Sequence, residues 1–331
     1  MNTPSVAPGL LRRTLAARVV VADGAMGTML QAANPTLEDF QSHEGCNEIL
    51  NVSRPDIVRS VHDEYLAAGV DAIETNTFGA NWSNLADYGI EDRIYELAFA
   101  GGRIAREAAD SFSTPDKPRF VLGSLGPGTK LPSLGHTTYE NLKVAYYTAA
   151  KGLADSGCDA LLVETSQDLL QVKAAVNGCR QAINESQRDI ILIAQVTVET
   201  TGTMLLGSEI GAALNTLEPM GIDLIGLNCA TGPTEMSEHL RYLSKNSKVA
   251  ISVMPNAGLP VLGANGASYP LGPDELAVAL DGFINDYGIS LVGGCCGTTP
   301  AHLSAVVKKV SGKKILERTP DLDPGASSLY Q

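Results

Sequence analysis

The sequence predicts a single (β/α)8 barrel of the TIM type with an extended C-terminal tail. Eight short runs of aliphatic and β-branched residues alternate with longer segments of helical periodicity. The runs are almost continuously apolar, which is typical of parallel strands covered on both faces. A chain of 331 residues also has the length of one large barrel. A doubly wound open sheet is the alternative with the same alternation.

The predicted strands cover residues 18–23, 70–76, 119–126, 158–165, 189–199, 222–229, 248–256 and 289–295. Helical segments between them include residues 54–69, 140–157 and 273–288. Four of the intervening segments end at a glycine just before the next strand, the expected helix C-cap: Gly69, Gly157, Gly221 and Gly288. We expect this repeat to be architectural, without an internal sequence repeat.

Two segments depart from the alternation. Residues 24–53 form a long excursion after the first strand and contain GAMGTMLQ and EGCNEILN. Residues 311–331 carry little apolar periodicity, so we expect a surface-hugging extension or a linker. The predicted organisation is therefore a barrel over residues 1–310 and, over residues 311–331, an extended tail or a linker to domains absent from this chain.

Composition narrows the class of protein. The net charge of −13 argues against nucleic acid or an anionic membrane surface as a partner. No apolar run approaches the ~18 residues of a membrane span, and the first residues lack the pattern of a signal peptide. Six cysteines in 331 residues do not make a disulfide scaffold. Free thiols in a reducing cytoplasm are therefore expected.

In such barrels the active site lies at the carboxyl ends of the strands. LVGGCCGTTPAHL (residues 291–303) places Cys295 and Cys296 where the last strand becomes a glycine-rich loop. Two adjacent strand residues face opposite sides of a sheet, but in a loop both sulfur atoms can turn to one point. Cys229 ends the sixth strand, so three sulfur atoms are expected at one rim. Three thiolates favour a borderline metal, with tetrahedral zinc as the leading candidate.

The remaining metal-binding residue types are not expected to join this site. None of the five histidines stands at a strand end: His43, His62, His136, His239 and His302. Cys46, Cys158 and Cys179 lie in a loop, at a strand start and in a helix, and we expect them to be structural. Three protein ligands leave a position open for substrate. A substrate thiol bound there would ionise at neutral pH and stay nucleophilic, which suits alkyl transfer to sulfur.

Four motifs resemble the zinc-dependent homocysteine S-methyltransferase family: DGAMGTML (23–30), GVDAIETNTFGAN (69–81), GLNCATGP (226–233) and GGCCGTTPAHL (293–303). The resemblance spans about residues 10 to 310. The opening DGAMGTMLQ and the tail GASSLYQ are most similar to the cobalamin-dependent members, in which folate, cobalamin and activation domains follow this barrel. Betaine-dependent relatives carry a tyrosine where this chain has Gly79, which argues against betaine as donor.

The resemblance implies a role for each matching residue. The implied zinc ligands are Cys229, Cys295 and Cys296, with the amide oxygen of Asn256 in the substrate-free state. Asp23 and Glu164 would hold the ammonium group of homocysteine. Thr75 and the backbone of Gly24 and Ala25 would hold its carboxylate.

The implied activity is a cytoplasmic methyltransferase reaction of methionine biosynthesis. The barrel would bind zinc and activate homocysteine as a thiolate, which takes a methyl group from methylcobalamin to give methionine. Methylcobalamin would be bound by a domain absent from this chain, so the implied partners are homocysteine and the cobalamin- and folate-binding domains of a longer enzyme.

Other readings of the same residues stay open. A stand-alone homocysteine methyltransferase could use S-methylmethionine as donor. A barrel lyase could carry a purely structural zinc, although no predicted strand ends in the lysine that a Schiff-base lyase needs. A thiol sensor is a third class. Glu74 and Glu199 are expected to be structural or to support the residues that contact the substrate. Asn228 is expected to orient the Cys229 loop, and His136 receives no role.

Overall fold

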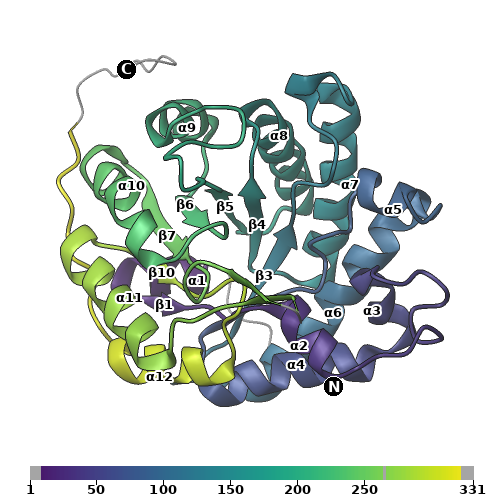
Figure 1. Ribbon diagram of the computed structural model, residues 1–331, viewed down its shortest axis with the longest axis horizontal. Helices are drawn as coiled ribbons and strands as arrows, with labels where there is room; N and C mark the ends of the chain where they lie inside the picture. Colours follow the sequence, from purple (N-terminus) through teal and green to yellow (C-terminus); the bar gives the residue numbers. More distant parts are fainter. Residues whose placement is uncertain (1–8, 264–265, 322–331) are drawn as a thin grey trace.

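A computed structural model describes residues 9–263 and 266–321. Eight parallel strands form one sheet in the order β1-β10-β7-β6-β5-β4-β3-β2, and the helices lie around them (Figure 1). The strands are β1 (Val20–Val21), β2 (Ala72–Glu74), β3 (Phe120–Leu125), β4 (Ala160–Ser166), β5 (Ile191–Val196), β6 (Leu224–Asn228), β7 (Ala250–Met254) and β10 (Leu291–Val292). Each predicted strand is present, with shorter regular pairing than the apolar runs suggest.

The helices follow the strands in the predicted alternation. The α-helices are α1 (Leu10–Ala17), α2 (Met26–Ala32), α3 (Leu50–Ser53), α4 (Pro55–Ala68), α5 (Trp82–Ala86), α6 (Ile94–Phe112), α7 (Tyr139–Ser156), α8 (Leu169–Ser186), α9 (Ile210–Leu217), α10 (Pro233–Asn246), α11 (Pro273–Tyr287) and α12 (Pro300–Val310). Four short 3-10 helices are η1 (Asn47–Ile49), η2 (Glu91–Arg93), η3 (Pro132–Leu134) and η4 (Glu218–Met220).

The first and last strands of the sheet order meet and nearly close the barrel. The backbone N–H of Asp71, just before β2, donates to the carbonyl of Val21 in β1 at 2.7 Å. A side-chain oxygen of Asp71 accepts from the N–H of Val21 in return, at 3.0 Å. A closed ring leaves no exposed sheet edge. The predicted (β/α)8 barrel is therefore confirmed, and the doubly wound alternative is excluded.

Alternate strand residues divide the core into two layers. Val20, Phe120, Leu122 and other inward residues fill the barrel, together with Leu11 and Leu15 of α1. The intervening strand residues pack outward against the helices in one larger cluster. This is the period of two that strand geometry imposes. The interior is a packed core, so the site must lie at the rim.

An aspartate begins β2, β4 and β6 in the same way. Asp71, Asp159 and Asp223 each follow a helix-ending glycine by two positions. The side chain of Asp159 accepts from the N–H of Val121 at 2.9 Å, as Asp223 does from Leu192 at 2.8 Å. The short G-x-D motif thus recurs before three of the strands. It ties β2, β4 and β6 each to the preceding strand at the amino-terminal end of the barrel.

The glycine caps are present as predicted, and two irregular segments take defined positions. Gly69, Gly157, Gly221 and Gly288 all have φ between 65° and 105°. The excursion of residues 24–53 contains α2, η1 and α3. A hairpin of β8 (Val261–Gly263) and β9 (Gly266–Ser268), which the sequence did not predict, follows β7.

The described part of the tail is bound along the barrel. The N–H of Val19 donates to the carbonyl of Lys313. Arg318 donates to the carbonyls of Ser247 and Val249, just before β7. The tail up to Asp321 therefore lies along the surface of the barrel, which is the first of the two arrangements expected for it. Residues 322–331 lie outside the described residues.

Candidate functional site

Three cysteine sulfur atoms meet at the carboxyl ends of β6 and β10. Cys229 directly follows β6, and Cys295 and Cys296 follow β10 after two glycines. The three Sγ atoms all lie within 4.8 Å of one another, and those of Cys229 and Cys296 are 3.8 Å apart. The structure thus brings together the three ligands predicted from the sequence.

The backbone around Cys229 is held in an unusual conformation. Cys229 and Ala230 have positive φ angles of 59° and 55°, a region that side chains other than glycine rarely adopt. The N–H of Cys229 donates to the carbonyl of Met254 at 3.2 Å, and the N–H of Thr231 donates to that of Cys229 at 2.6 Å. Such strain persists where the surroundings fix it, and it often marks a functional site.

Glycine is required beside the cysteine pair because Thr298 packs against the loop. A Cβ atom at residue 294 would lie 2.4 Å from the hydroxyl oxygen of Thr298. That hydroxyl donates to the carbonyl of Cys295 at 2.7 Å and accepts from the N–H of Ala25 at 3.2 Å. α12 then begins at Pro300, with Thr299 as its N-cap. Thr298 therefore locks the Cys295 turn to the loop after β1.

The chemistry of the donor set fits a thiophilic metal ion. Hydrogen bonds from the thiols of Cys229 and Cys295 lower the pKa of Cys296 to about 3. The cluster therefore already stabilises one thiolate, with two S–H groups directed at it. A metal cation in place of those two protons would hold all three sulfur atoms as thiolates.

Asn256 lies next to this cluster but is engaged elsewhere. Its side-chain oxygen accepts a hydrogen bond from the N–H of Cys296 at 3.1 Å, and the residue is buried. Asn256 is not among the residues that line the adjoining cavity. In this structure its amide therefore shapes the Cys296 turn.

A cavity of about 430 Å³ opens beside the cysteines at the strand ends. All three cysteines line it, together with three acidic residues: Glu48 in η1, Glu74 at the end of β2 and Glu164 in β4. Thr75, Gly24 and Ala25 also line it, as predicted for substrate-binding groups. Sulfur ligands and acidic groups thus share one cavity.

Three carboxyl groups, those of the buried Asp23 and Glu164 and of the partly exposed Glu74, form a cluster at this end of the barrel. Asp23 is 1% exposed, and its two oxygens accept from the N–H of Glu74 at 3.0 and 3.1 Å. Burial, followed by the charges of Glu164 and Asp23, raises the pKa of Glu74 well above its ordinary value. Burial also raises the pKa of Glu164 to about 7 and that of Asp23. A cation such as an ammonium group would relieve this repulsion.

Glu164 is fixed by hydrogen bonds from neighbouring strand ends. The hydroxyl of Ser124, in β3, donates to Glu164 at 2.5 Å. The side-chain amide of Asn228 donates to the other oxygen at 3.0 Å, and its carbonyl accepts from the N–H of Thr165 at 2.7 Å. Asn228 therefore joins Glu164 to the strand that ends at Cys229, consistent with its expected orienting role.

The sequence interpretation missed Glu74 as a cavity residue. We expected it to be structural or to support the residues that contact the substrate, yet it lines the cavity, whereas Asp23 is not one of the lining residues. The signal was the alternation within β2. Ala72 points into the barrel and Ile73 outward, so Glu74 has to point inward at the rim.

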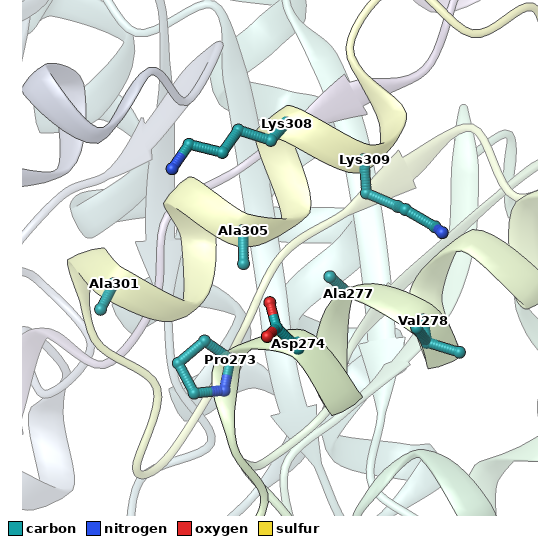
Figure 2. Close-up of a pocket in the computed structure, with 8 residues that line it drawn as sticks. All are labelled: Pro273, Asp274, Ala277, Val278, Ala301, Ala305, Lys308 and Lys309. Atoms are coloured by element: carbon teal, nitrogen blue, oxygen red, sulfur yellow. The ribbon is translucent and has the colours of Figure 1, made fainter.

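The other cysteines and a surface groove between α11 and α12 lie apart from this chemistry. Cys46, Cys158 and Cys179 are fully or almost fully buried, and burial raises the pKa of Cys158 to about 12. In the described part of the chain, the trio at the rim is the sole cluster of metal-binding side chains. A groove of about 550 Å³ between α11 and α12 is lined by alanines, Val278 and a few charged groups (Figure 2).

Across residues 9–263 and 266–321, no helix has the length and apolarity that a membrane span requires.

Comparison with known proteins gives a consistent result. The family model described as homocysteine S-methyltransferase matches residues 20–310. A methionine synthase of Mycobacterium tuberculosis is 63% identical over 96% of this chain, and one of Mycobacterium leprae is 60% identical over 97%. The chain spans 26% and 27% of the lengths of these two relatives.

A solved structure shows the same fold. The metallated form of the homocysteine methyltransferase MmuM from Escherichia coli superposes with a TM-score of 0.70 at 22% identity, over 87% of this chain and 95% of that one. The family match covers nearly the whole barrel, strand ends included. The chain belongs to the homocysteine S-methyltransferase family, a family of methyltransferase enzymes.

Proposed function

We propose that this chain is the homocysteine-activating barrel of a cobalamin-dependent methionine synthase. The observation that carries the proposal is the convergence of three thiols and the carboxyl groups of Glu74 and Glu164 on one cavity, with Asp23 hydrogen-bonded to the backbone of Glu74. The thiols suit a zinc ion, and the carboxyl groups suit the ammonium group of an amino acid. Homocysteine carries both a sulfur atom for the metal and an ammonium group for the acids.

Cys229, Cys295 and Cys296 would hold the zinc ion. Bound there, zinc would keep the sulfur of homocysteine ionised near neutral pH. Asn256 would supply an oxygen ligand before substrate arrives, which requires its amide to turn from the N–H of Cys296. A neutral amide oxygen is a weak ligand on thiolate-rich zinc, so the substrate sulfur would displace it readily.

The remaining groups would orient the amino acid. Glu164 would contact the ammonium group, and Asp23 would contribute its charge. Glu74 lines the cavity beside them and belongs to the same acidic cluster. Thr75 and the backbone of Gly24 and Ala25 would bind the carboxylate. The charged and neutral ends of the site would thereby fix the direction in which the sulfur points.

Methyl transfer would then be an in-line displacement. The sulfur attacks the methyl carbon, a carbon–sulfur bond forms, and the bonding electron pair leaves with the donor. The thiol proton has already gone to solvent. The similarity to longer methionine synthases favours methylcobalamin as donor, carried by a cobalamin-binding domain beyond this chain, with a folate-binding domain as a further partner.

We place the barrel in residues 1–310 and the connection to further domains in residues 311–331. All six cysteines of the chain are free thiols in the structure. A site built of thiols needs a reducing compartment to stay active, which favours the cytoplasm.

Stopped-flow spectroscopy of methylcobalamin mixed with the zinc-loaded chain and homocysteine tests this function. We expect slow, zinc-dependent demethylation, because the chain lacks the effective concentration that a tethered cobalamin domain provides. Calorimetry in buffers of different ionisation enthalpy should show release of about one proton on homocysteine binding. A demethylation rate equal to that of the metal-free chain would contradict the proposal.

A further inference from the structure

The site cavity has a second wall that the amino-acid site does not use. Cavities of roughly 300–1,000 Å³ accommodate drug-sized ligands, whereas homocysteine is much smaller. The cavity measures about 430 Å³, and part of its lining comes from α2, the excursion and α5 instead of the cysteine and acidic loops. We call this part the α2–α5 wall and define it by Gln31, Gly45, Asn47, Glu48, Phe78 and Asn84.

The α2–α5 wall offers hydrogen-bond acceptors. The side-chain oxygen of Asn84 is buried and has no hydrogen-bond partner among the described residues. Buried polar atoms normally have a hydrogen-bond partner, so this oxygen is expected to accept a hydrogen bond from a ligand. Glu48 is 6% exposed and adds a carboxyl group to the same wall, whose two oxygens accept from the N–H of Gly79 and the thiol of Cys46. Phe78, which is 42% exposed, supplies an apolar surface beside them.

Glu48 also explains why the wall is open at residue 79. One of its oxygens accepts from the N–H of Gly79 at 2.6 Å. A Cβ atom at residue 79 would lie 2.9 Å from that oxygen. No side chain fits there while Glu48 holds its position. The Glu48–Gly79 contact therefore keeps side-chain bulk out of the cavity.

Homocysteine does not match this wall. Its ammonium group is matched by the acidic cluster of Asp23, Glu74 and Glu164, and its sulfur by the cysteines. Its carboxylate is itself an acceptor, which the acceptors of the wall would repel. The reaction needs a second reactant within reach of the same sulfur atom, and the wall lies in the same cavity.

We propose that the α2–α5 wall binds the methyl donor, through an edge of the donor that carries N–H groups such as carboxamides. Asn84 accepts a hydrogen bond from this edge, and Phe78 packs against its apolar part. The inference rests on the proposed function, since it concerns the second substrate of that reaction.

Substitution of Asn84 tests the wall, with methylcobalamin as the probe. Asn84→Ala should lower the second-order rate constant for methylcobalamin demethylation about five- to tenfold at saturating homocysteine, as expected when one partner of a buried hydrogen bond is removed. Asn84→Asp keeps an acceptor and should restore most of the rate. Zinc content and the homocysteine Kd should stay within twofold of the parent, because neither site includes Asn84.

A bulky side chain gives a second, steric test. Gln31, an exposed residue of α2, also lines the cavity. Gln31→Trp should obstruct the donor and lower the same rate constant at least tenfold. Ala32 is exposed on the same helix but is not a lining residue, so Ala32→Trp is the matched control and should leave the rate unchanged.

The outcomes separate the two proposals. If the parent shows no zinc-dependent demethylation, the proposed function fails, and the donor wall with it. If the parent is active while Asn84→Ala and Gln31→Trp react at the parental rate, the wall proposal alone is overturned. If Asn84→Ala weakens homocysteine binding as much as it slows demethylation, Asn84 serves the amino acid, and the wall proposal is likewise overturned.

Discussion

At the scale of residues, the six cysteines form two groups with different surroundings. Cys229, Cys295 and Cys296 are partly exposed at the rim and lie within reach of one another. Cys46, Cys158 and Cys179 are buried, and burial disfavours their thiolates. Only the first group has both access to solvent and the mutual stabilisation of charge that metal binding requires.

Cys295→Ala should therefore abolish stoichiometric zinc binding. Two remaining thiolates leave the ion without the donor set that holds it. Metal analysis of the purified protein after dialysis measures the effect. Cys158→Ala is the matched control, since it removes a buried thiol far from the rim, and it should keep one zinc per chain. Full zinc content in the Cys295 variant would refute the ligand assignment.

The acidic cluster predicts how amino-acid binding depends on pH. Burial raises the pKa of Glu164 to about 7, and only its carboxylate form attracts an ammonium group. Affinity should therefore increase as pH rises through about 7 and fall toward tenfold per pH unit below it. L-Methionine is the suitable probe, because its sulfur has no proton to lose. Calorimetric titration between pH 5.5 and 8.5, values chosen to span about 7, measures the effect.

Glu164→Gln should remove most of this pH dependence and weaken methionine binding by about 1.5–3 kcal/mol, the cost of a lost charge-assisted hydrogen bond. Zinc content should not change, because Glu164 is not one of the three ligands. An unchanged pH profile in this variant would show that another group accounts for the titration.

How much of the site was predictable at this scale follows from strand geometry. The cysteines and Glu164 could be found because parallel strands deliver their carboxyl ends to one rim. Glu74 could have been found from the alternation in β2. The positions of Asn84 and Glu48 at the cavity could not be predicted, because they depend on how irregular segments after β1 and β2 fold over the rim. No sequence period governs such a segment.

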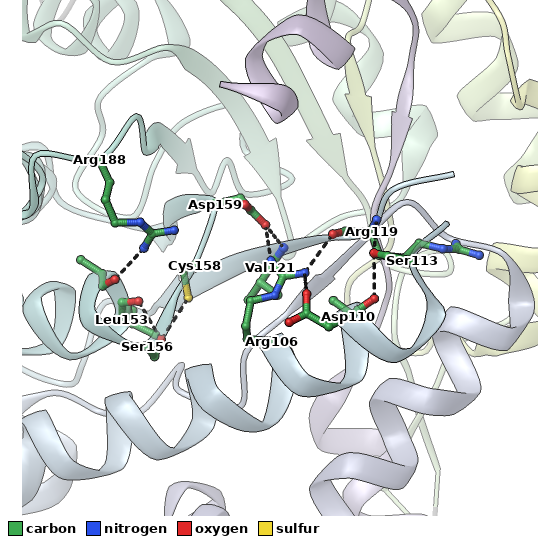
Figure 3. Close-up of polar contacts among 12 residues, drawn as sticks. Arg106, Asp110, Ser113, Arg119, Val121, Leu153, Ser156, Cys158, Asp159 and Arg188 are labelled. Carbon is green, nitrogen blue, oxygen red and sulfur yellow. Dashed lines mark hydrogen bonds and ion pairs between the residues drawn. The ribbon is translucent and has the colours of Figure 1, made fainter. Parts of the chain in front are cut away.

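At the scale of elements, charged pairs fasten the amino-terminal ends of the strands. Arg106 of α6 donates to Asp159 at 2.8 Å, and Asp159 in turn accepts from the N–H of Val121 (Figure 3). Arg18 pairs with Asp71, and Arg12 of α1 with Asp223. Each pair joins the G-x-D motif to a neighbouring element. The face opposite the site thus carries stabilising contacts.

Asp159→Ala should destabilise the protein by about 3 kcal/mol, because it leaves the largely buried Arg106 without this partner and frees the N–H of Val121. Urea unfolding followed by circular dichroism measures it. Glu107→Ala is the matched control, because Glu107 lies in α6 beside Arg106 and forms an exposed pair with Arg103. This substitution should change the free energy of unfolding by less than about 0.5 kcal/mol. Equal effects of the two substitutions would contradict this account.

Elements of regular period were predictable, and those without one were not. The eight strands and the helix-ending glycines follow from apolar periodicity and capping rules. The β8–β9 hairpin was not predicted, because residues 261–268 show little of the alternation of apolar and polar residues that predicts strands. The role of the G-x-D motif was not predicted, because its aspartate accepts a hydrogen bond from the backbone of a neighbouring strand, and that contact exists only in the folded barrel.

At the scale of the whole molecule, the fold and the metal are largely independent. The barrel has a continuous core between strands and helices and a second core inside the strands. A domain of this size buries enough surface to fold without a metal. The proposed metal site occupies one rim, where hydrogen bonds already hold the loops that it would join.

Chelation of zinc should therefore leave the far-ultraviolet circular dichroism unchanged. The midpoint of thermal unfolding should fall by a few degrees, since a ligand that binds only the native state stabilises it. Cooperative unfolding should persist. Loss of the helical signal on chelation, as in a zinc finger, would contradict this independence.

Zinc K-edge absorption spectroscopy during homocysteine titration tests the central claim most directly. The account holds that the three cysteines bind zinc and leave one position for the sulfur of homocysteine. It predicts three sulfur ligands and one lighter ligand without substrate, and four sulfur ligands at saturation. The transition should follow the binding isotherm measured independently. A zinc coordination shell that stays the same throughout the titration would contradict the claim and favour a purely structural metal.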